Sequence, residues 1–574
     1  MTLDKRLLNF LVIIVLTFFT FWWTGFVFHI PFALEAFFVI VAARVLASFL
    51  IFRDYSLSWS KATQKTFLIK AIVYCAAFVV YVPLLYTHMR LAFLVSELFF
   101  YLFSLNFLMY SYYYAINKTR NKKSKSVVIF GAGAAGVKLK SEYRNSKYKI
   151  KFFVDDDQFL QKRSINGIRI LSRKLAKEVL LDQKVDLFVV AIPSASNLAI
   201  KEIYDEFSGF CKNVKILPKL ENILQNEAFA NQLKNISVED LLARHPKDLD
   251  KSVIENFVKN KIVLITGAGG SIGSEICRQC AKYGAKKLIL LDHSEYNLYQ
   301  IAEELNGKID LSLVMQSVTN KDMLGSTFAT HLPDIVLHAA AYKHVPLVED
   351  NITEGIVNNI IGTKNTIDCA IKYGVKKFVL ISTDKAVRPT NVMGTTKRIC
   401  ELYAQNVEPN QTEIVAVRFG NVLGSSGSVI PKFKSQIEQG GPITVTHPDI
   451  TRYFMLIPEA CELVLQAASL GRGGEIFILD MGEPVKIIDL AQKMIELSGV
   501  ENIEIKVTGL RPGEKLYEEL LINDSDAKTQ YDSITVASKT NYDIYKLNQD
   551  IFDLVVADDK LSKLKEIVPE FEHR

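Results

Sequence analysis

Four long apolar segments at the N-terminus constrain this chain more than any other feature of its sequence. They cover roughly residues 7–28, 31–52, 67–87 and 91–116. Each reaches or exceeds the ~20 residues that a helix needs to span a bilayer. The first is too long for the core of a signal peptide, and no small-residue cleavage site precedes the next segment. The sequence therefore predicts a transmembrane region of four helices over residues 1–117.

Basic residues near these segments predict their orientation. They precede the first segment, separate the second from the third and follow the fourth, as Lys5, Arg6, Arg53, Lys61, Lys65, Lys118, Arg120, Lys122, Lys123 and Lys125. The loops at 29–30 and 88–90 carry only Arg90. Because cytoplasmic loops are rich in Lys and Arg, we expect everything after residue 117 in the cytoplasm. Glu97 is expected to face a neighbouring helix, with a functional intramembrane acid as the alternative.

Composition limits the classes of partner and site. The formal charge of +6 is small for 574 residues, and basic residues are mixed with acidic ones through most of the chain. This argues against nucleic acid as a partner. Cys277 and Cys280 form a C-x-x-C, but they lie in an amphipathic helix pattern without a second pair. We therefore expect reduced, buried thiols and no metal site, in a cytosolic redox setting.

A first glycine motif follows the apolar region. Residues 127–136 read VVIFGAGAAG, and a second apolar stretch, IKFFVDDD, ends about 20 residues on in Asp155–Asp157. This G-x-G-x-x-G in a strand–helix–strand context predicts a Rossmann-like domain of nucleotide-binding type over residues 118–240. The motif leaves two interpretations equally open. Either the domain binds a nucleotide or nucleotide-sugar, or the glycine turn serves only the fold.

A second glycine motif is stronger. Residues 261–273 read KIVLITGAGGSIG. Gly267 permits a sharp turn, Gly270 lets the backbone approach a pyrophosphate, and Gly273 lets a helix pack close to the strand. The next strand, KKLILLD, ends in Asp292, and an acid there accepts from a ribose 2′-hydroxyl and repels a 2′-phosphate, which favours NAD over NADP. Residues 314–320 fall where the adenine is usually held.

Further apolar strands alternate with helical stretches at 334–341, 377–382 and 413–424. This alternation predicts a parallel, doubly wound sheet whose ligands collect at the carboxyl ends of the strands. Polar residues follow these strands: Lys343 and His344, then Thr383, Asp384 and Lys385, then Asn421. His338 ends a buried strand and is expected to be structural.

Motifs within residues 255–530 together resemble one family: TGAGGSIGSE, HAAAYKHVP, STDKAVRPTNVMGTTKR, RFGNVLGSSGSVIP, TRYFM and GLRPGEK. They resemble the extended short-chain dehydrogenase/reductase superfamily and, within it, the bacterial UDP-N-acetylglucosamine 4,6-dehydratases. Lys397 stands where the superfamily has the lysine of Tyr-x-x-x-Lys, but Met393 replaces the tyrosine and cannot exchange a proton. The apolar segments, the first Rossmann-like domain and Met393 resemble the large, configuration-retaining branch that is multi-pass in the bacterial inner membrane.

The resemblance implies four transmembrane helices followed by two α/β Rossmann-like domains, the second over residues 241–574 with a doubly wound parallel sheet. It implies NAD-dependent conversion of UDP-N-acetylglucosamine to UDP-2-acetamido-2,6-dideoxy-α-D-xylo-hexos-4-ulose for glycan synthesis, by a homo-oligomer. The alternatives are a C5-inverting dehydratase, a 4-epimerase of UDP-sugars, and a non-catalytic nucleotide-sugar sensor or scaffold. The Asp384–Lys385 pair argues against a plain epimerase, and Met393 is the feature that favours the sensor.

By resemblance, Asp384 is the acid for the departing 6-hydroxyl and Lys385 is the base at C5, while Thr383 hydrogen-bonds the 4-hydroxyl. Lys385 must be neutral to act, so burial or the neighbouring Lys397 or Lys343 is expected to lower its pKa. The proton of the 4-hydroxyl leaves through Thr383, a water or Lys397, and these alternatives stay open. Lys397 would also hold the nicotinamide ribose.

The resemblance also implies binding residues. Those expected to hold NAD are Gly267, Gly270, Ser271, Ile272, Gly273, Asp292, Ser317, Val318, Ala339, Ala340 and Lys397. Those expected to contact the UDP-sugar are Lys343, Met393, Asn421, Val429, Arg452, Arg511 and Glu514. Of these, Asn421 would contact the diphosphate or sugar, Val429 the uracil and Glu514 a ribose hydroxyl. Arg452 and Arg511 would clamp phosphates with their forked donors.

Overall fold

The computed structural model describes residues 5–52, 64–120, 125–143, 146–218, 228–242, 248–500, 502–519 and 527–573. The chain divides into two compact units, Met1–Leu171 with Ala228–Ala230, and Ser172–Glu227 with Asn231–Arg574. Each is described by itself.

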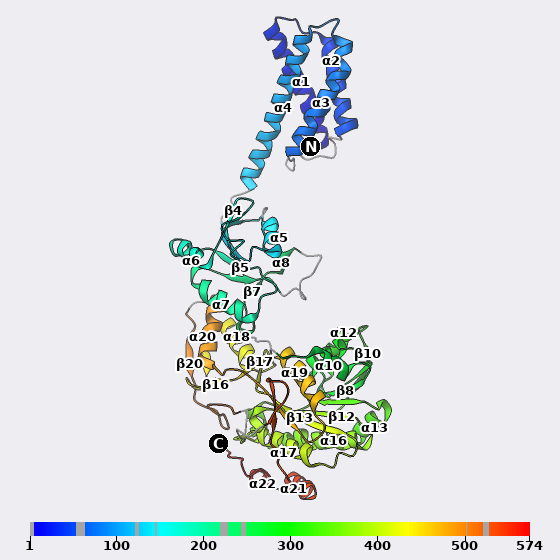
Figure 1. The fold of residues 1–574 in the computed structure, drawn as a ribbon, viewed down its shortest axis with the longest axis vertical. Coiled ribbons are helices and arrows are strands. Elements are labelled where there is room, and N and C mark those ends of the chain that lie inside the picture. Colours follow the sequence, from blue (N-terminus) through cyan, green and yellow to red (C-terminus); the bar gives the residue numbers. More distant parts are fainter. Residues whose placement is uncertain are drawn as a thin grey trace. The chain divides into compact units, whose positions relative to one another are not determined.

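The first unit begins with four long apolar helices, drawn in blue in Figure 1. They are α1 (Lys5–Phe28), α2 (Leu34–Ala47) with the π-helical turn η1 (Ser48–Phe52), α3 (Gln64–Leu85) and α4 (Leu91–Arg120). All four are long and apolar enough to cross a membrane, which confirms the predicted helices. Arg53, Lys61, Lys122 and Lys123, on which the predicted orientation partly depends, lie outside the described residues.

A buried ion pair links three of these helices. Arg44 Nη2 on α2 lies 2.5 Å from Glu97 Oε2 on α4, and both side chains are fully buried. Thr20 on α1 donates to Glu97 Oε1 at 2.7 Å, and the Arg44 guanidinium lies 3.7 Å from the centre of the Tyr101 ring. Glu97 therefore faces its neighbours as predicted. Its partner Arg44 was missed, because it lies inside a segment defined by apolar composition.

The first unit also contains a small α/β part. Strand β1 (Lys125–Phe130) pairs in parallel with β2 (Tyr148–Val154), β2 with β4 (Ile168–Leu171), and β3 (Ser164–Ile165) is antiparallel to β4. The predicted glycine turn precedes α5 (Ala134–Tyr143). A Cβ on Gly136 would lie 2.0 Å from Gly131 O, and Asp155 Oδ2 accepts from the backbone N–H of Ala132 at 2.6 Å.

The second unit begins with short elements that precede its main sheet. These are α6 (Arg173–Asp182), β5 (Leu187–Val190), α7 (Asn197–Phe207), β6 (Val214–Ile216), β7 (Lys234–Asn235) and α9 (Val238–Leu242). Strand β6 is parallel to β5 and antiparallel to β7.

Among the described residues, the main sheet has nine strands. In spatial order they are β10 (Asp310–Met315), β9 (Lys287–Asp292), β8 (Ile262–Thr266), β11 (Ile335–His338), β12 (Lys377–Ile381), β13 (Glu413–Arg418), β18 (Ile476–Leu479), β22 (Ile534–Ala537) and β21 (Ala527–Lys528). The first seven are parallel, β22 is antiparallel to them, and β21 is antiparallel to β22 and so runs in the direction of the first seven. The order reverses between β8 and β11, and such a switch point is where doubly wound sheets bind ligands.

Helices cover both faces of this sheet because its central strands are buried on both sides. Val263 and Ile265 of β8 belong to one core, and Leu264 between them belongs to the other. The first core includes residues of α10 (Lys251–Val258), α11 (Ser271–Lys282), α12 (Glu295–Leu305) and α19 (Ile457–Leu470). The second includes residues of α13 (Lys321–His331), α16 (Gly362–Lys372), α17 (Val392–Asn406), α21 (Ile544–Val556) and α22 (Lys560–Ile567).

A smaller lobe has its own apolar core. It is formed around α18 (Val429–Glu438), α20 (Ile487–Ser498) and three strand pairs: β14 (Asn421–Leu423) with β17 (Phe454–Leu456), β15 (Ile443–Val445) with β20 (Ile505–Val507), and β16 (Thr451–Arg452) with β19 (Val485–Lys486). Residues of this lobe and of the main sheet together line the cavity described next.

Candidate active site

Two adjoining cavities lie at the carboxyl ends of the parallel strands. One, of about 750 Å³, is lined by the 267–274 turn, and we call it the glycine cavity. The other, of about 390 Å³, contains Lys343, Lys385, Lys397 and Lys432 in its wall, and we call it the lysine cavity. Ile272, Ala339 and Lys343 line both, so the two form one continuous cleft.

The glycine cavity has the shape that a dinucleotide needs. Gly267 adopts φ +65°, and a Cβ on Gly273 would lie 2.0 Å from Gly267 O. Only glycine therefore permits this approach between turn and helix. The turn leads into α11, whose N-terminal N–H groups favour a pyrophosphate. Asp292 Oδ2 accepts from Gly269 N–H at 2.9 Å, which fixes the acid beside the turn.

The predicted cofactor residues divide into two groups. Those that line the glycine cavity are Gly267, Gly270, Ser271, Ile272, Gly273 and Ala339. The described residues that line this cavity do not include Asp292, Ser317, Val318, Ala340 or Lys397. Val318 is instead buried against Gly362, where a Cβ would meet Val318 Cγ2 at 2.6 Å. Sequence reasoning missed Asn297 and Glu354, which line the cavity from helices without a motif, and Asn351, which caps a short helix.

The catalytic candidates follow β12. Thr383 caps the 3-10 turn η7 (Asp384–Ala386), and its hydroxyl donates to Asp384 Oδ1 at 2.8 Å. Lys385 Nζ donates to the same oxygen at 3.0 Å and to Asn421 Oδ1 at 3.3 Å. Asp384 is fully buried behind Thr383 and Lys385, which line the lysine cavity. Its Oδ2 faces Gly420, where a Cβ would lie 3.1 Å away.

The charge state of Lys385 differs from the expectation. Burial acts to lower the pKa of its ammonium, but the nearby carboxylates of Asp384 and Glu518 outweigh burial and raise it. The expected lowering of this pKa was therefore wrong. It rested on burial or on the charge of Lys397 or Lys343, whereas the carboxylate of Asp384 is in direct hydrogen-bond contact with Lys385.

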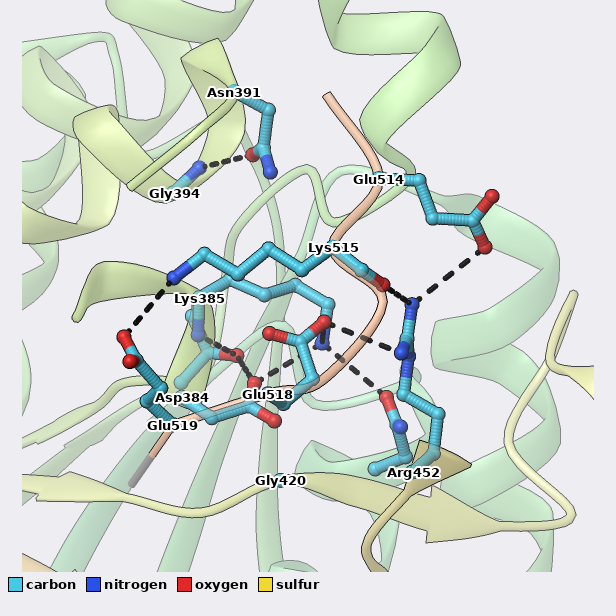
Figure 2. Close-up of polar contacts among 12 residues, drawn as sticks. Asp384, Lys385, Asn391, Gly394, Gly420, Arg452, Glu514, Lys515, Glu518 and Glu519 are labelled. Atoms are coloured by element: carbon cyan, nitrogen blue, oxygen red, sulfur yellow. Dashed lines mark hydrogen bonds and ion pairs between the residues drawn. The ribbon is translucent and has the colours of Figure 1, made fainter. Parts of the chain in front are cut away.

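Glu518 is a site residue that the sequence did not reveal. Its side chain is only 4% exposed, and Oε1 lies 3.7 Å from Lys385 Nζ and 3.5 Å from Arg452 Nε. Figure 2 shows Glu518 between these two cations. Burial and the Asp384 charge raise the pKa of the Glu518 carboxyl. No motif marks it, because it reaches Lys385 from a loop remote in the sequence.

This loop, residues 511–519, is fixed at several points. The Thr390 hydroxyl and Asn391 Nδ2 both donate to Gly513 O, at 2.9 and 3.1 Å. Arg452 donates to the carbonyls of Lys515 and Leu516, at 2.8 and 3.3 Å. Arg452 thus holds the loop in this structure, and the predicted contact with phosphate stays a prediction.

Helix α17 supplies Met393 and Lys397 to the lysine cavity. Asn391 caps the helix by accepting from Gly394 N–H at 2.8 Å (Figure 2). Burial lowers the pKa of the Lys397 ammonium. The buried Glu401 anchors the helix to the sheet by accepting from Arg418 Nη2 on β13 at 2.6 Å.

The residues predicted to bind the UDP-sugar also line the lysine cavity. Lys343, Asn421, Val429, Arg452, Arg511 and Glu514 all line it. Glu514 Oε1 accepts from the Thr446 hydroxyl at 3.2 Å, which orients its carboxylate. Lys432 also lines the cavity, and sequence reasoning missed it because it lies on a helix face without a motif. Burial and the charge of Arg511 lower the pKa of Lys432, so two cations lie near one another there.

Three further predictions concern residues away from this chemistry. His338 is fully buried, and its ring bonds the hydroxyls of Thr266 at 2.8 Å and Thr363 at 3.0 Å, as expected of a structural histidine. Cys277 and Cys280 are buried free thiols, as predicted. Within the part of the chain that the structure describes, no cluster of three His, Cys, Asp or Glu side chains is arranged to hold a metal.

Comparison with known proteins gives consistent matches. The family described as "Polysaccharide biosynthesis protein" matches residues 263–539. The probable polysaccharide biosynthesis protein EpsC of Bacillus subtilis is 44% identical over 460 residues, 77% of either chain. The UDP-N-acetylglucosamine 4,6-dehydratase (inverting) of Campylobacter jejuni is 36% identical, over 47% of this chain and 80% of its own. The UDP-glucose 4-epimerase of Rickettsia canadensis is 35% identical over the same shares.

Proposed function

Because the chain belongs to the polysaccharide biosynthesis protein family, we propose that it is a membrane-anchored, NAD-dependent UDP-N-acetylglucosamine 4,6-dehydratase. Similar proteins include a named dehydratase and a named epimerase, and both reactions begin by oxidising C4 of a nucleotide-sugar. The dehydratase needs a further acid and base for C5 and C6, which a plain epimerase does not.

The observation that carries the proposal is the pair Asp384–Lys385 at the wall of the lysine cavity. An acid and a base lie 3.0 Å apart, and Lys385 lines the same cavity as Lys397 of α17. A surface ion pair would be solvated, whereas Asp384 is fully buried and Lys385 is 20% exposed. Buried titratable pairs in a cleft are typical of acid–base catalysis.

The 267–273 turn and the N-terminus of α11 would hold the pyrophosphate of NAD in the glycine cavity. Bound NAD would supply reversible hydride transfer, so that oxidation at C4 and reduction at C6 leave no net oxidation. Lys397 accepts the proton of the 4-hydroxyl, because burial favours its neutral form and Met393 cannot take it. Neutral Lys385 removes the C5 proton, and protonated Asp384 gives its proton to the departing 6-hydroxyl. Afterwards Lys397 releases its proton to solvent and Asp384 regains one from solvent. Thr383, which lines the cavity, donates to Asp384 and orients its carboxyl.

The uridine diphosphate occupies the part of the lysine cavity near α18. Arg511 and Lys432 face its phosphates, Val429 packs against the uracil, and Glu514 accepts from a ribose hydroxyl. The four apolar helices anchor the protein in the bacterial inner membrane with the catalytic part in the cytoplasm, near membrane glycosyltransferases. Retention at C5 and a homo-oligomeric state complete the proposal, and both rest on the resemblance of Met393 and the apolar segments to the membrane-bound branch.

The test is turnover by the purified full-length protein in detergent. Incubation with UDP-N-acetylglucosamine in D₂O, without added cofactor, should give a product lighter by one water, with a C6 methyl group and one deuterium at C5. Mass spectrometry and NMR measure these, and the ring couplings report the C5 configuration. An epimerase would give UDP-N-acetylgalactosamine without loss of water. A sensor would bind the sugar and leave it unchanged even with added NAD.

A further inference from the structure

The position of Glu518 leads to a role in the chemistry at C5, and this inference rests on the proposed dehydration. We propose that Glu518 is a positioning residue that sets the protonation state of Lys385 by exchanging a proton with it. The geometry that carries this proposal is a buried cluster in which one lysine faces two carboxylates. Lys385 Nζ lies 3.0 Å from Asp384 Oδ1 and 3.7 Å from Glu518 Oε1.

A base for the C5 proton must be a neutral amine, yet a lysine beside carboxylates holds its proton. The conflict is resolved if the proton passes to one of those carboxylates. The step is Lys385-NH₃⁺ with Glu518-COO⁻ giving Lys385-NH₂ with Glu518-COOH. Lys385 then takes the C5 proton, returns one proton to C5 after water has left, and recovers the first proton from Glu518. No proton or electron is gained or lost in this exchange.

Glu518 suits this role better than Asp384. In the proposed reaction Asp384 is the acid at C6 and starts with a proton of its own, so it cannot also take the proton of Lys385. Asp384 Oδ2 and Glu518 Oε2 are both buried and accept no hydrogen bond from the described residues, so each has room for one proton. Burial raises the pKa of the Glu518 carboxyl, which favours its protonated state.

Four charged groups around Glu518 influence the pKa of its carboxyl. Lys385 and Asp384 face it from η7, Arg452 from β16 and Lys515 from its own loop. Arg452 Nε lies 3.5 Å from Oε1, and its charge acts to lower the pKa of the Glu518 carboxyl, against burial. Glu518 is also held in place, because Lys515 Nζ donates to Val387 O at 3.0 Å and Gly513 packs against Asn391.

The test compares the pH dependence of kcat in the full-length protein. In the wild type, Lys385 and Glu518 share one proton, so kcat should be flat between about pH 7 and 9. In Glu518→Gln, Lys385 must lose its proton to solvent, so kcat should rise about tenfold per pH unit. At pH 7 the variant should be about 100-fold slower, within the range of acid–base effects. Glu518→Asp should keep the flat profile at a reduced rate.

Glu519→Gln is the matched control. Glu519 is the next residue on the same loop, 42% exposed, and pairs with Arg388 at 3.2 Å and with Lys515 at 3.5 Å rather than with Lys385. Its profile should match the wild type. A flat profile in Glu518→Gln, however slow the variant is, would show a structural role only and overturn the inference. A wild-type protein that does not dehydrate the substrate would overturn the proposed function, and the inference with it. Dehydration by the wild type with a flat Glu518→Gln profile would overturn the inference alone.

Discussion

Met393 and Lys397 lie one turn apart on α17 and both line the lysine cavity. Met393 is 3% exposed, and it stands where the resemblance to short-chain dehydrogenases places a tyrosine. The helix keeps its lysine at the spacing of a short-chain dehydrogenase, without the tyrosine. In the proposed reaction, acid–base chemistry therefore depends on Lys397, Lys385 and Asp384.

Variants at Met393 and Lys397 test which of the two side chains takes part in proton transfer. We expect Met393→Leu to keep kcat within about threefold, because volume-conserving apolar exchanges are tolerated. Lys397→Met should lower kcat by about 10²–10⁴, the usual contribution of a general base. Turnover of UDP-N-acetylglucosamine by both purified variants checks this. Equal losses in the two would contradict the assignment of the 4-hydroxyl proton to Lys397.

Replacing Asp384 tests the acid at C6. Asp384→Asn keeps the shape of the side chain but removes its transferable proton, so loss of water should slow by about 10²–10⁴. Oxidation of C4 does not need this acid, so reduced nicotinamide should accumulate when substrate is added. Its absorbance and fluorescence report this. Dehydration at the wild-type rate would exclude Asp384 as the acid.

The ion pair Arg44–Glu97 permits a double-mutant cycle. Removing one partner leaves a buried charge, so Arg44→Leu and Glu97→Leu should each destabilise the protein by about 3–5 kcal/mol. Replacing both with leucine should be nearly neutral, because no unpaired charge remains. Thermal unfolding of the four variants in one detergent measures the cycle. Additive losses in the double variant would mean that the two side chains do not act as a pair.

Buried His338 predicts a loss of stability in acid. Burial lowers the pKa of its imidazole to about 3, whereas the unfolded value is about 6.5. Between these values the unfolded chain binds more protons than the native protein, so stability falls as pH decreases from 6.5. The slope is about 1.4 kcal/mol per pH unit, or about 2 kcal/mol between pH 6.5 and 5. Urea unfolding of wild type and His338→Asn should show this difference in slope, and equal slopes would refute it.

The parts of the fold that depend on local pattern could be predicted from the sequence. Four apolar helices, the two glycine turns and the parallel strands all follow from runs of residue types along the chain. The three polar residues after β12 were expected near the ligand because parallel strands end at one edge of the sheet, and two of them, Thr383 and Lys385, line the lysine cavity. The domain boundaries at 117/118 and 240/241 stay predictions.

What could not be predicted depends on contacts between remote segments. Glu518 approaches Lys385 only because Gly513 and Arg452 fix a loop across the cleft. The charge of Glu518 adds to that of the adjacent Asp384, and together they reverse the expected direction of the Lys385 pKa shift. Arg44 and Lys432 lie on helices whose patterns give no sign of their partners. Glu518, Glu97 and Arg511 each reach their partner from another element, and no window of sequence contains both members of such a pair.

The 511–519 loop joins two tasks within nine residues. Arg511 and Glu514 at its start line the lysine cavity, and Glu518 near its end faces the proposed base. A ligand that binds Arg511 and Glu514 therefore contacts the same loop that carries Glu518. The uridine diphosphate would then do more than hold the sugar, since the energy of its binding could be used at a reacting carbon it never touches. The same loop would then serve both the recognition of the nucleotide and the reactivity of the sugar.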